Sequence, residues 1–361
     1  MNDKVTLMKG NEALAMAMIR YGADGYFGYP ITPQSEVLEK LEEEMPWDTT
    51  GMVVLQAESE VAAINMVYGG AMTGKAVCTS TSSPGFSLMQ EGVSYLAASE
   101  VPALLINVQR GGPGLGTIHA SQADYFQACK GGGHGDYHMI VLAPSSVQEM
   151  ADMVALGFDL AFKYRCVSMI LADGTIGQLM EKVVLPEQRP RRTEEQIREQ
   201  CPWAVNGRKG MRPSNVVTSL ELDDDKMEEN NWRFQACYRE IEKNETRCEF
   251  VGDEDCDYLI TAFGTTARIA MKTMELARAE GIKVGLFRPI TLWPFPEKQL
   301  REAAKNVKGI LCVELNAGQM VEDVKLAVEC KMPVEHYGRF GGNVPTPDEL
   351  LNVLKEKLIN K

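Results

Sequence analysis

A proline-rich segment near the N-terminus combines a threonine with a restricted backbone. Gly28-Tyr29-Pro30-Ile31-Thr32-Pro33 follows an apolar run and precedes the amphipathic stretch QSEVLEKLEEEM. The prolines fix φ at two positions, and Pro33 disfavours the helical region at Thr32, so a stiff turn is expected. In open α/β sheets, ligands bind at the carboxyl edge, where such turns lie. Spacing alone nevertheless favours an ordinary strand-to-helix turn over a binding site.

A second segment places carboxylates where a helix is expected to begin. In Gln56-Ala57-Glu58-Ser59-Glu60-Val61-Ala62-Ala63 a predicted strand ends and an apolar helix starts. Ser59 is a suitable N-cap, and acidic side chains are favoured at a helix N-terminus. An acid in this place is able to point into a cleft. By spacing alone, Glu60 is more simply interpreted as a helix-end carboxylate.

A third segment brings an arginine to the end of an apolar strand. PALLINV is followed by Gln109, Arg110 and the glycine-rich run GGPGLG. A guanidinium offers a planar fork that matches a carboxylate or a phosphate, and glycine lets a ligand approach the backbone. The run is not the dinucleotide fingerprint, which requires G-x-G-x-x-G opening the first helix of a strand–helix unit.

Histidines and cysteines are weaker candidates. His134 and His138, in and after the loop KGGGHGD, are of a type suited to acid–base chemistry, although loop residues without chemistry are the preferred interpretation. No two of the nine cysteines are spaced C-x-x-C, so neither a zinc ribbon nor a ferredoxin-type cluster motif is present. A metal site among Cys237, Cys248 and Cys256 is disfavoured, and free thiols suit a reducing compartment.

The overall charge limits the classes of partner. The chain has 361 residues and a formal net charge of −13, from 37 basic and 50 acidic residues. Such a surface repels phosphate backbones, so nucleic acid is not an expected partner. No uncharged apolar stretch is long enough to cross a bilayer, and the N-terminal segment is unlike a secretory signal. We therefore expect a cytoplasmic protein without a membrane span.

Apolar runs alternate with amphipathic stretches along most of the chain. KAVCTSTS, PALLINVQ and CVSMILA indicate strands, whereas EVAAINMVYGGAM indicates a helix. Strand–helix repetition with strands rich in Val, Ile and Leu predicts a parallel sheet covered on both faces. We predict an α/β unit over residues 1–185, a charged connecting region over 186–250, and a smaller α/β unit over 251–361.

Taken together, YPITP near residue 30, E-x-E near residue 60 and QRGGP near residue 110 resemble a known family. Their order and spacing are similar to those of the alpha subunit of 2-oxoacid:ferredoxin oxidoreductases. The end of the chain, GRFGGNVPTPDEL, resembles the transketolase C-terminal-like domain of that family. The resemblance implies a thiamine-diphosphate-binding fold, a parallel sheet covered by helices, followed by that smaller domain.

The resemblance also implies roles for individual residues. Glu60 matches the glutamate that hydrogen-bonds the aminopyrimidine ring, and it is chosen over Glu58 because the following V-Y-G keeps its spacing to Glu60. Thr32 matches the threonine beside the thiamine C2 atom and the substrate, and Arg110 the arginine that holds the substrate carboxylate. Further residues expected near the cofactor are Tyr29, Pro30, Ile31, Ser82, Ser83 and Pro84.

By the same resemblance, the chain acts within a complex. Thiamine diphosphate is expected to be shared with a beta subunit that carries the diphosphate and Mg²⁺ site. A ferredoxin-like subunit is expected to hold [4Fe-4S] clusters, and a gamma subunit the coenzyme A-related domain. The implied reaction is the oxidative decarboxylation of a 2-oxoacid to an acyl-CoA and CO2, with ferredoxin as electron acceptor. No metal is expected on this chain.

The substrate is predicted from the loop after QRGGP. Residues 118–120, Ile-His-Ala, are not strongly basic, whereas relatives that use 2-oxoglutarate tend to have basic residues there. ADYFQA with KGGGHGDY looks most like the branched-chain type, which uses 3-methyl-2-oxobutanoate. Pyruvate and 2-oxoglutarate are alternatives. More remote alternatives are a stand-alone nucleotide-binding dehydrogenase and a non-catalytic scaffold protein.

Overall fold

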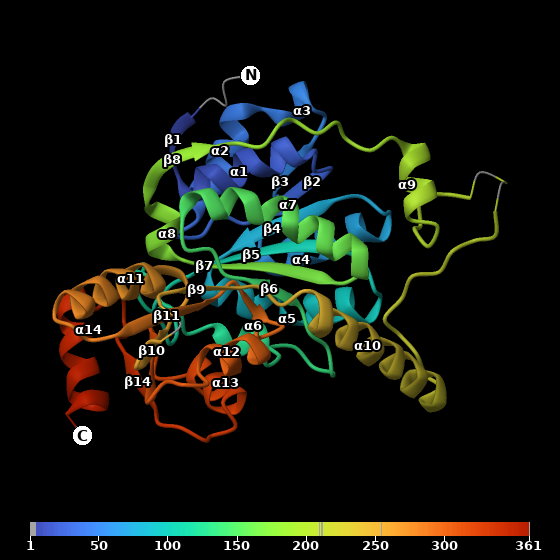
Figure 1. The fold of residues 1–361 in the computed structure, drawn as a ribbon. Helices are drawn as coiled ribbons and strands as arrows, with labels where there is room; N and C mark the ends of the chain where they lie inside the picture. The colour runs from blue at the N-terminus through green and yellow to red at the C-terminus, as the bar shows by residue number, and fades with distance from the viewer. Residues whose placement is uncertain (1–4, 209, 211, 254, 361) are drawn as a thin grey trace.

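Two α/β units, joined by a partly helical connection, make up the computed structural model of the chain (Figure 1). The structure describes residues 5–208, 210, 212–253 and 255–360. The remaining positions of the three predicted regions lie outside the described residues. The predicted class, a mostly parallel sheet followed by a smaller α/β unit, is confirmed. None of the described helices is both long and apolar enough to span a bilayer.

The first unit is built on a seven-stranded sheet in the order β12-β6-β7-β5-β4-β2-β3. Neighbouring strands are parallel, except that β12 is antiparallel to β6. The strands are β2 (Gly25–Gly28), β3 (Val53–Gln56), β4 (Val77–Thr81), β5 (Ala103–Gln109), β6 (Ile140–Leu142), β7 (Val167–Asp173) and β12 (Thr291–Trp293). β12 comes from the segment predicted to form the second unit. Its pairing with β6 in the first sheet was not predicted from the sequence.

Helices cover both faces of this sheet (Figure 1). α1 (Gly10–Tyr21) packs with α7 (Val147–Tyr164) on one face, and α4 (Glu60–Met72) packs with α5 (Ser83–Ala98) on the other. The shorter elements are α2 (Ser35–Glu44), α3 (Pro46–Thr49), α6 (Tyr125–Cys129), α8 (Gly174–Gln178) and the antiparallel ribbon of β1 (Val5–Lys9) with β8 (Met180–Val184).

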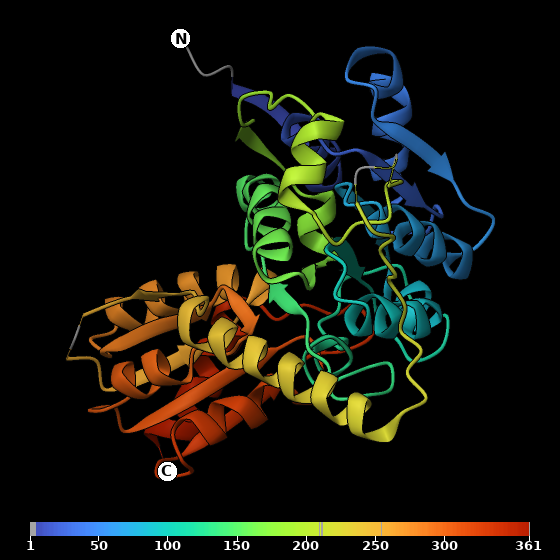
Figure 2. The same cartoon turned by 90° about the vertical axis from the view of Figure 1, so that its right-hand side faces the viewer.

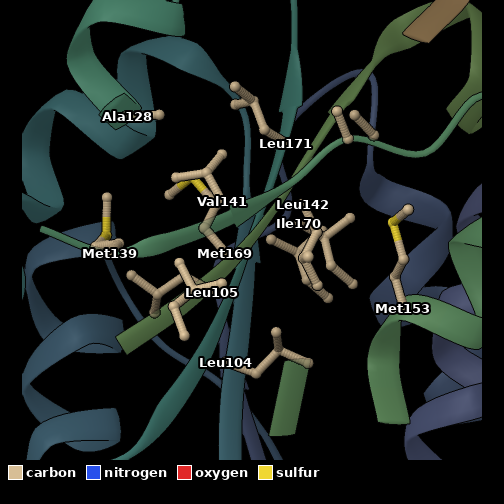
Figure 3. Close-up of a cluster of buried hydrophobic side chains, with 14 of the residues drawn as sticks. Leu104, Leu105, Ala128, Met139, Val141, Leu142, Met153, Met169, Ile170 and Leu171 are labelled. Carbon is tan, nitrogen blue, oxygen red and sulfur yellow. The ribbon is translucent and has the colours of Figure 1, made fainter. Parts of the chain in front are cut away.

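The core of the first unit lies where its central strands are enclosed on both faces. β5 and β7 are buried along their whole length, as expected for strands that are apolar throughout. Figure 3 shows Leu104 and Leu105 of β5 beside Met169 and Ile170 of β7, with Met153 approaching from α7. Each such side chain contributes about 1.5–3 kcal/mol by its removal from water. The carboxyl ends of these strands are thereby held on a rigid base.

The second unit is a five-stranded sheet in the order β14-β13-β10-β11-β9, of which only the edge strand β9 is antiparallel. Its strands are β9 (Cys248–Val251), β10 (Tyr258–Thr261), β11 (Val284–Pro289), β13 (Gly309–Glu314) and β14 (Val334–Gly338). One face carries α11 (Gly264–Ala279) and α14 (Pro347–Leu354), which continues as η1 (Lys355–Ile359), and the other carries α12 (Glu297–Ala303) and α13 (Met320–Ala327).

The connection contains α9 (Glu194–Gln200) and α10 (Asp224–Asn244). Figure 2 shows α10 lying across the side of the molecule, next to both units. Its residue Tyr238 is buried, with its ring edge-on to Trp293 of β12 and to His138, whose own ring stacks on Trp293 at 4.5 Å. This aromatic contact ties α10 to the place where the second unit donates a strand to the first.

Buried polar contacts fix the two units against each other. Gln122 is fully buried between them: its Nε2 donates to the Phe263 carbonyl oxygen at 2.7 Å, and its Oε1 accepts from the Leu315 amide at 3.0 Å. Asp173, at the end of β7, accepts from both the amide and the hydroxyl of Thr265 at 2.9 and 2.6 Å. Because these groups are shielded from water, removing one partner while the units stay packed would leave the other unpaired.

We predict that Gln122→Leu destabilises the full chain although it adds apolar surface. The Leu315 amide would lose its partner, and the Phe263 carbonyl oxygen would keep the Thr266 hydroxyl but lose the Gln122 amide, which together lowers the free energy of unfolding by about 2–4 kcal/mol. Urea unfolding followed by circular dichroism measures the change. Gln299→Leu is the control, because Gln299 is exposed and, among the described residues, its side chain bonds only the Thr246 hydroxyl. Equal midpoints for the two variants would contradict the prediction.

Candidate active site

The sequence motifs meet at one edge of the first sheet. Strands β2 to β5 and β7 run parallel, so their carboxyl ends lie at the same edge, where open α/β sheets bind ligands. The YPITP turn leaves β2, the segment ending in Glu60 leaves β3, Ser82 and Ser83 follow β4, and Arg110 follows β5. The fold therefore brings together side chains that are distant from one another in the sequence.

The YPITP turn is anchored by the side chain of Gln34, the N-cap residue of α2. Gln34 Nε2 donates to the Tyr29 carbonyl oxygen at 3.3 Å, and the Gln34 amide donates to that of Ile31 at 2.9 Å. Its Oε1 accepts from Ser80 Oγ at 2.6 Å, and Ser80 also bonds the Tyr26 hydroxyl at 2.7 Å. The half-buried turn is thus fastened to both β2 and β4.

Thr32 stands at the exposed tip of this turn. Two side chains hold the Pro33 carbonyl oxygen that follows it: Asn11 Nδ2 at 2.6 Å and Gln178 Nε2 at 3.0 Å. The Thr32 carbonyl oxygen accepts from Arg110 Nη1 at 2.8 Å. Within the described residues the Thr32 hydroxyl has no hydrogen bond. It is therefore held in place by its backbone while its side chain remains available to a ligand.

Arg110 is 9% exposed and is fixed at two points. Its Nη1 binds the Thr32 carbonyl oxygen, and its amide donates to Ser83 Oγ at 3.0 Å. Its Nε is buried and has no partner within the described residues. In the described part of the chain no carboxylate is paired with this guanidinium and some of its donors are unused, so it is suited to a carboxylate or phosphate ligand.

Glu60 is the buried one of the two predicted acids. It opens α4 and is 6% exposed, whereas Glu58 is exposed; Ser59 caps the helix by accepting from the Ala62 amide at 3.2 Å. Within the described residues Glu60 has no side-chain hydrogen bond or ion pair. The positive end of the α4 dipole partly compensates its charge. Its carboxylate is thus free to accept a hydrogen bond from a ligand.

Gly85 lies close against the Glu60 carboxylate and Thr81. A methyl group at Gly85 would lie 2.6 Å from Glu60 Oε1 and 2.2 Å from Thr81 Oγ1, both closer than van der Waals contact allows. The Thr81 hydroxyl and the neighbouring Ser82 hydroxyl are buried, and neither has a partner among the described residues. Buried polar groups are normally paired, so this cluster of unpaired groups indicates a polar ligand.

Two hollows flank the contact between Arg110 and Thr32. One, of about 600 Å³, is lined by Ser83, Pro84 and Arg110, and the other, of about 670 Å³, is lined by Thr32 and His119. The second unit closes the first hollow. Its lining residues from that unit are Leu315, Asn316, Ala317, Gln319, Phe340 and Gly341.

Asp124 is a site residue that the sequence interpretation missed. Its Oδ2 accepts from Ser83 Oγ at 2.6 Å and from Asn107 Nδ2 at 2.9 Å, and it lines the same hollow as Arg110. Burial raises the pKa of the Asp124 carboxyl, although the two hydrogen bonds oppose that shift. It lies at the far end of the loop that begins at Arg110, so no short motif joins the two residues.

The other sequence candidates lie away from this site. His134 is exposed, and burial against Trp293 and Tyr238 lowers the pKa of His138; neither histidine lines the two hollows. All nine cysteines are free thiols. In the described part of the chain, no three His, Cys, Asp or Glu side chains form a group able to hold a metal ion.

Two family profiles match the chain. Residues 16–243 match the family described as pyruvate flavodoxin/ferredoxin oxidoreductase, thiamine diphosphate-binding. Residues 256–350 match pyruvate:ferredoxin oxidoreductase core domain II. The first profile contains every predicted site residue, and the second corresponds to the unit that closes the Arg110 hollow.

Individual relatives agree with these profiles. The chain is 47% identical to ketoisovalerate oxidoreductase subunit VorB of Methanothermobacter marburgensis, with 97% of each chain covered. It is 34% identical to 2-oxoglutarate synthase subunit KorA of Archaeoglobus fulgidus, with 98% of this chain and 100% of that one covered. The solved 2-oxoglutarate:ferredoxin oxidoreductase from Magnetococcus marinus, with 2-oxoglutarate, coenzyme A and succinyl-CoA bound, has a TM-score of 0.82 at 27% identity. The match covers 98% of this chain and spans 65% of that one.

We predict that Glu60→Gln raises the stability of the chain without added ligand. An unpaired buried carboxylate is costly, and its removal outweighs the smaller loss of interaction with the α4 dipole, for a net gain of about 1 kcal/mol. Thermal unfolding monitored by circular dichroism measures the shift. Glu58→Gln, at the exposed neighbour, should leave the midpoint unchanged. A lower midpoint for Glu60→Gln would show that the carboxylate is structurally paired.

Proposed function

The chain belongs to the thiamine-diphosphate-binding family of pyruvate flavodoxin/ferredoxin oxidoreductases, and we propose from this that it is the alpha subunit of a complex that oxidatively decarboxylates 3-methyl-2-oxobutanoate. Coenzyme A takes the acyl group and ferredoxin the electrons. The observation that carries the proposal is the arrangement at one sheet edge of an unpaired buried carboxylate, Glu60, with the linked pair Arg110 and Thr32.

The residues near Glu60 fit the aminopyrimidine ring of thiamine diphosphate. When bound, the cofactor supplies a carbon nucleophile and an electron sink for decarboxylation. Glu60 is placed to hold a proton at the ring nitrogen N1′, because its side chain is buried, lacks a partner in the described structure and lies close to Gly85 in the first turn of α5. The unpaired hydroxyls of Thr81 and Ser82 offer further polar contacts to the ring. We assign Tyr29, Pro30 and Ile31 to the adjoining wall, because their turn leaves β2, the strand beside β3.

Arg110 and Thr32 suit the two ends of a 2-oxoacid head group. The guanidinium pairs with the carboxylate and orients it, and the Thr32 hydroxyl donates to the 2-oxo oxygen, where negative charge develops. Since Arg110 is bonded to the Thr32 carbonyl oxygen, the two donors keep a fixed separation. The pairing with Arg110 must weaken as CO2 leaves, so its main contribution is to binding and orientation.

The size and lining of the Arg110 hollow support an apolar substrate side chain. Of the described residues that line it, Arg110 is the only cation, and Leu315, Ala317 and Phe340 supply apolar surface. A second carboxylate would meet no cation there and would approach Asp124. The 47% identity to a ketoisovalerate oxidoreductase subunit supports the same choice over 2-oxoglutarate or pyruvate.

The remaining parts of the reaction are assigned to partner subunits. We place the diphosphate and Mg²⁺ site on a beta subunit, the [4Fe-4S] clusters on a ferredoxin-like subunit and the coenzyme A-related domain on a gamma subunit. The names of the relatives, each given as a subunit, support a multi-subunit complex. This chain also spans only 65% of the longer chain from Magnetococcus marinus. The cofactor would then lie at an interface, with its ring on this chain.

The proposed function is tested with the complex isolated by a tag on this chain. Glu60→Ala should lower kcat for 2-oxoacid oxidation, followed with a viologen dye, by at least about 100-fold, because proton transfer at the ring is lost. Glu58→Ala, at the exposed acid of the same E-x-E motif, is the matched control and should retain activity. The assignment is wrong if Glu60→Ala remains near wild-type, or if the complex oxidises no 2-oxoacid.

The substrate assignment is tested by placing a cation in the hollow. Phe340 is 60% exposed and lines the wall supplied by the second unit. Phe340→Arg should lower kcat/KM for 3-methyl-2-oxobutanoate and raise it for 2-oxoglutarate, each by about tenfold, since a second carboxylate gains a partner. Leu115→Arg adds the same charge at an exposed site outside the lining and is the control. Parallel changes for both substrates would refute the assignment.

A further inference from the structure

Asp124 lies where the loop that begins at Arg110 returns to the sheet. Its amide donates to the side chain of Gln109 at 3.0 Å, so the two ends of the loop are joined directly. It is the N-cap residue of α6, but its carboxylate makes no capping hydrogen bond. Instead the carboxylate turns toward Ser83 and Asn107, near the ends of the adjacent strands β4 and β5. This orientation indicates a purpose other than capping a helix.

The Asp124 carboxylate determines which way the Ser83 hydroxyl points. At 2.6 Å, Ser83 Oγ donates to Asp124 Oδ2, which leaves its lone pairs for the Arg110 amide at 3.0 Å. The Arg110 carbonyl oxygen lies 3.3 Å from the same hydroxyl and is the competing acceptor. Without Asp124, the hydroxyl hydrogen would turn to that carbonyl. The Ser83 side chain would then lose the contact that holds it in place, and the Arg110 amide would lose an acceptor of fixed position.

Both partners of Asp124 Oδ2 are donors. Asn107 Nδ2 donates at 2.9 Å and Ser83 Oγ at 2.6 Å, an arrangement that suits an acceptor without a proton. An amide in place of the carboxyl retains one carbonyl oxygen that accepts both hydrogen bonds. A methyl group retains none. Substituting Asp124 by asparagine or by alanine therefore distinguishes the effect of losing the hydrogen-bond acceptor from the effect of losing the negative charge.

We propose that Asp124 is a positioning residue that acts through Ser83 to hold the Arg110 backbone, and so aims the guanidinium at the substrate carboxylate. The proposal rests on the function proposed above, in which Arg110 binds that carboxylate. Asp124 lines the hollow with Arg110, but no ion pair joins these two described residues, so the link runs through the serine. Asp124 does not itself touch the reacting atoms in this assignment.

The test compares Asp124→Ala and Asp124→Asn in the intact complex. Asp124→Ala should raise KM for the 2-oxoacid about tenfold, equivalent to the loss of one buried hydrogen bond, while the Kd of thiamine diphosphate changes less than about twofold. Asp124→Asn should restore KM to within about threefold of wild-type, because the acceptor is retained. Asp136→Ala, at an exposed aspartate, controls for loss of charge. An unchanged KM for Asp124→Ala overturns the proposal.

A double-mutant cycle separates positioning from a general structural effect. In an Arg110→Ala background, Asp124→Ala should not raise KM further, since the guanidinium that Asp124 positions is absent. Additive effects of the two substitutions on KM would overturn the proposal. If Asp124→Ala does not assemble, Ser83→Ala breaks the same link and should give the same KM change and the same non-additivity. If Arg110→Ala alone leaves KM unchanged, the proposed function fails instead, so the two failures are distinguishable.

Discussion

The hydrogen bond from Arg110 Nη1 to the Thr32 carbonyl oxygen joins loops from two strands that are not neighbours. β4 lies between β2 and β5, and it leads directly into α5. Ser80 on β4 anchors the YPITP turn through Gln34, and Ser83 just beyond β4 anchors Arg110. The site geometry thus depends on one central strand whose polar residues reach both sides.

The site carries an energetic cost that the rest of the unit offsets. The described structure leaves the hydroxyls of Thr81 and Ser82 and the Arg110 Nε buried without partners, and each such group costs on the order of 1–3 kcal/mol. The enclosed strands β5 and β7 supply many buried apolar side chains directly beneath these groups. The faces of the sheet are covered by helices, which gives a rigid apolar core. Its carboxyl edge is not covered in this way, and the unpaired polar groups lie at that edge.

Local patterns were sufficient to predict several central strands and helices and the mostly parallel sheet, because alternation and loop chemistry are local properties. They could not predict that Thr291–Trp293 adds a strand beside β6, since that pairing joins parts of the chain that are remote in sequence. They also missed Asp124 and Phe340, which contribute through the return of a long loop and through the second unit. Both acids of E-x-E were visible in the sequence, but only the fold separates the buried Glu60 from the exposed Glu58.

The loop from Arg110 to Asp124 connects the substrate-binding edge of the first unit to the second unit. Arg110 stands at its start, Asp124 closes it, and Gln122 fastens it to Leu315 and Phe263 of the second unit. Gly111 and Gly342 approach so closely that a methyl group on either would press on the facing loop. Since the same loop sets the position of the guanidinium, the packing of the second unit is part of substrate recognition. We therefore expect a displacement at the junction of the units to act more directly on Arg110, at the start of this loop, than on Glu60, which opens α4.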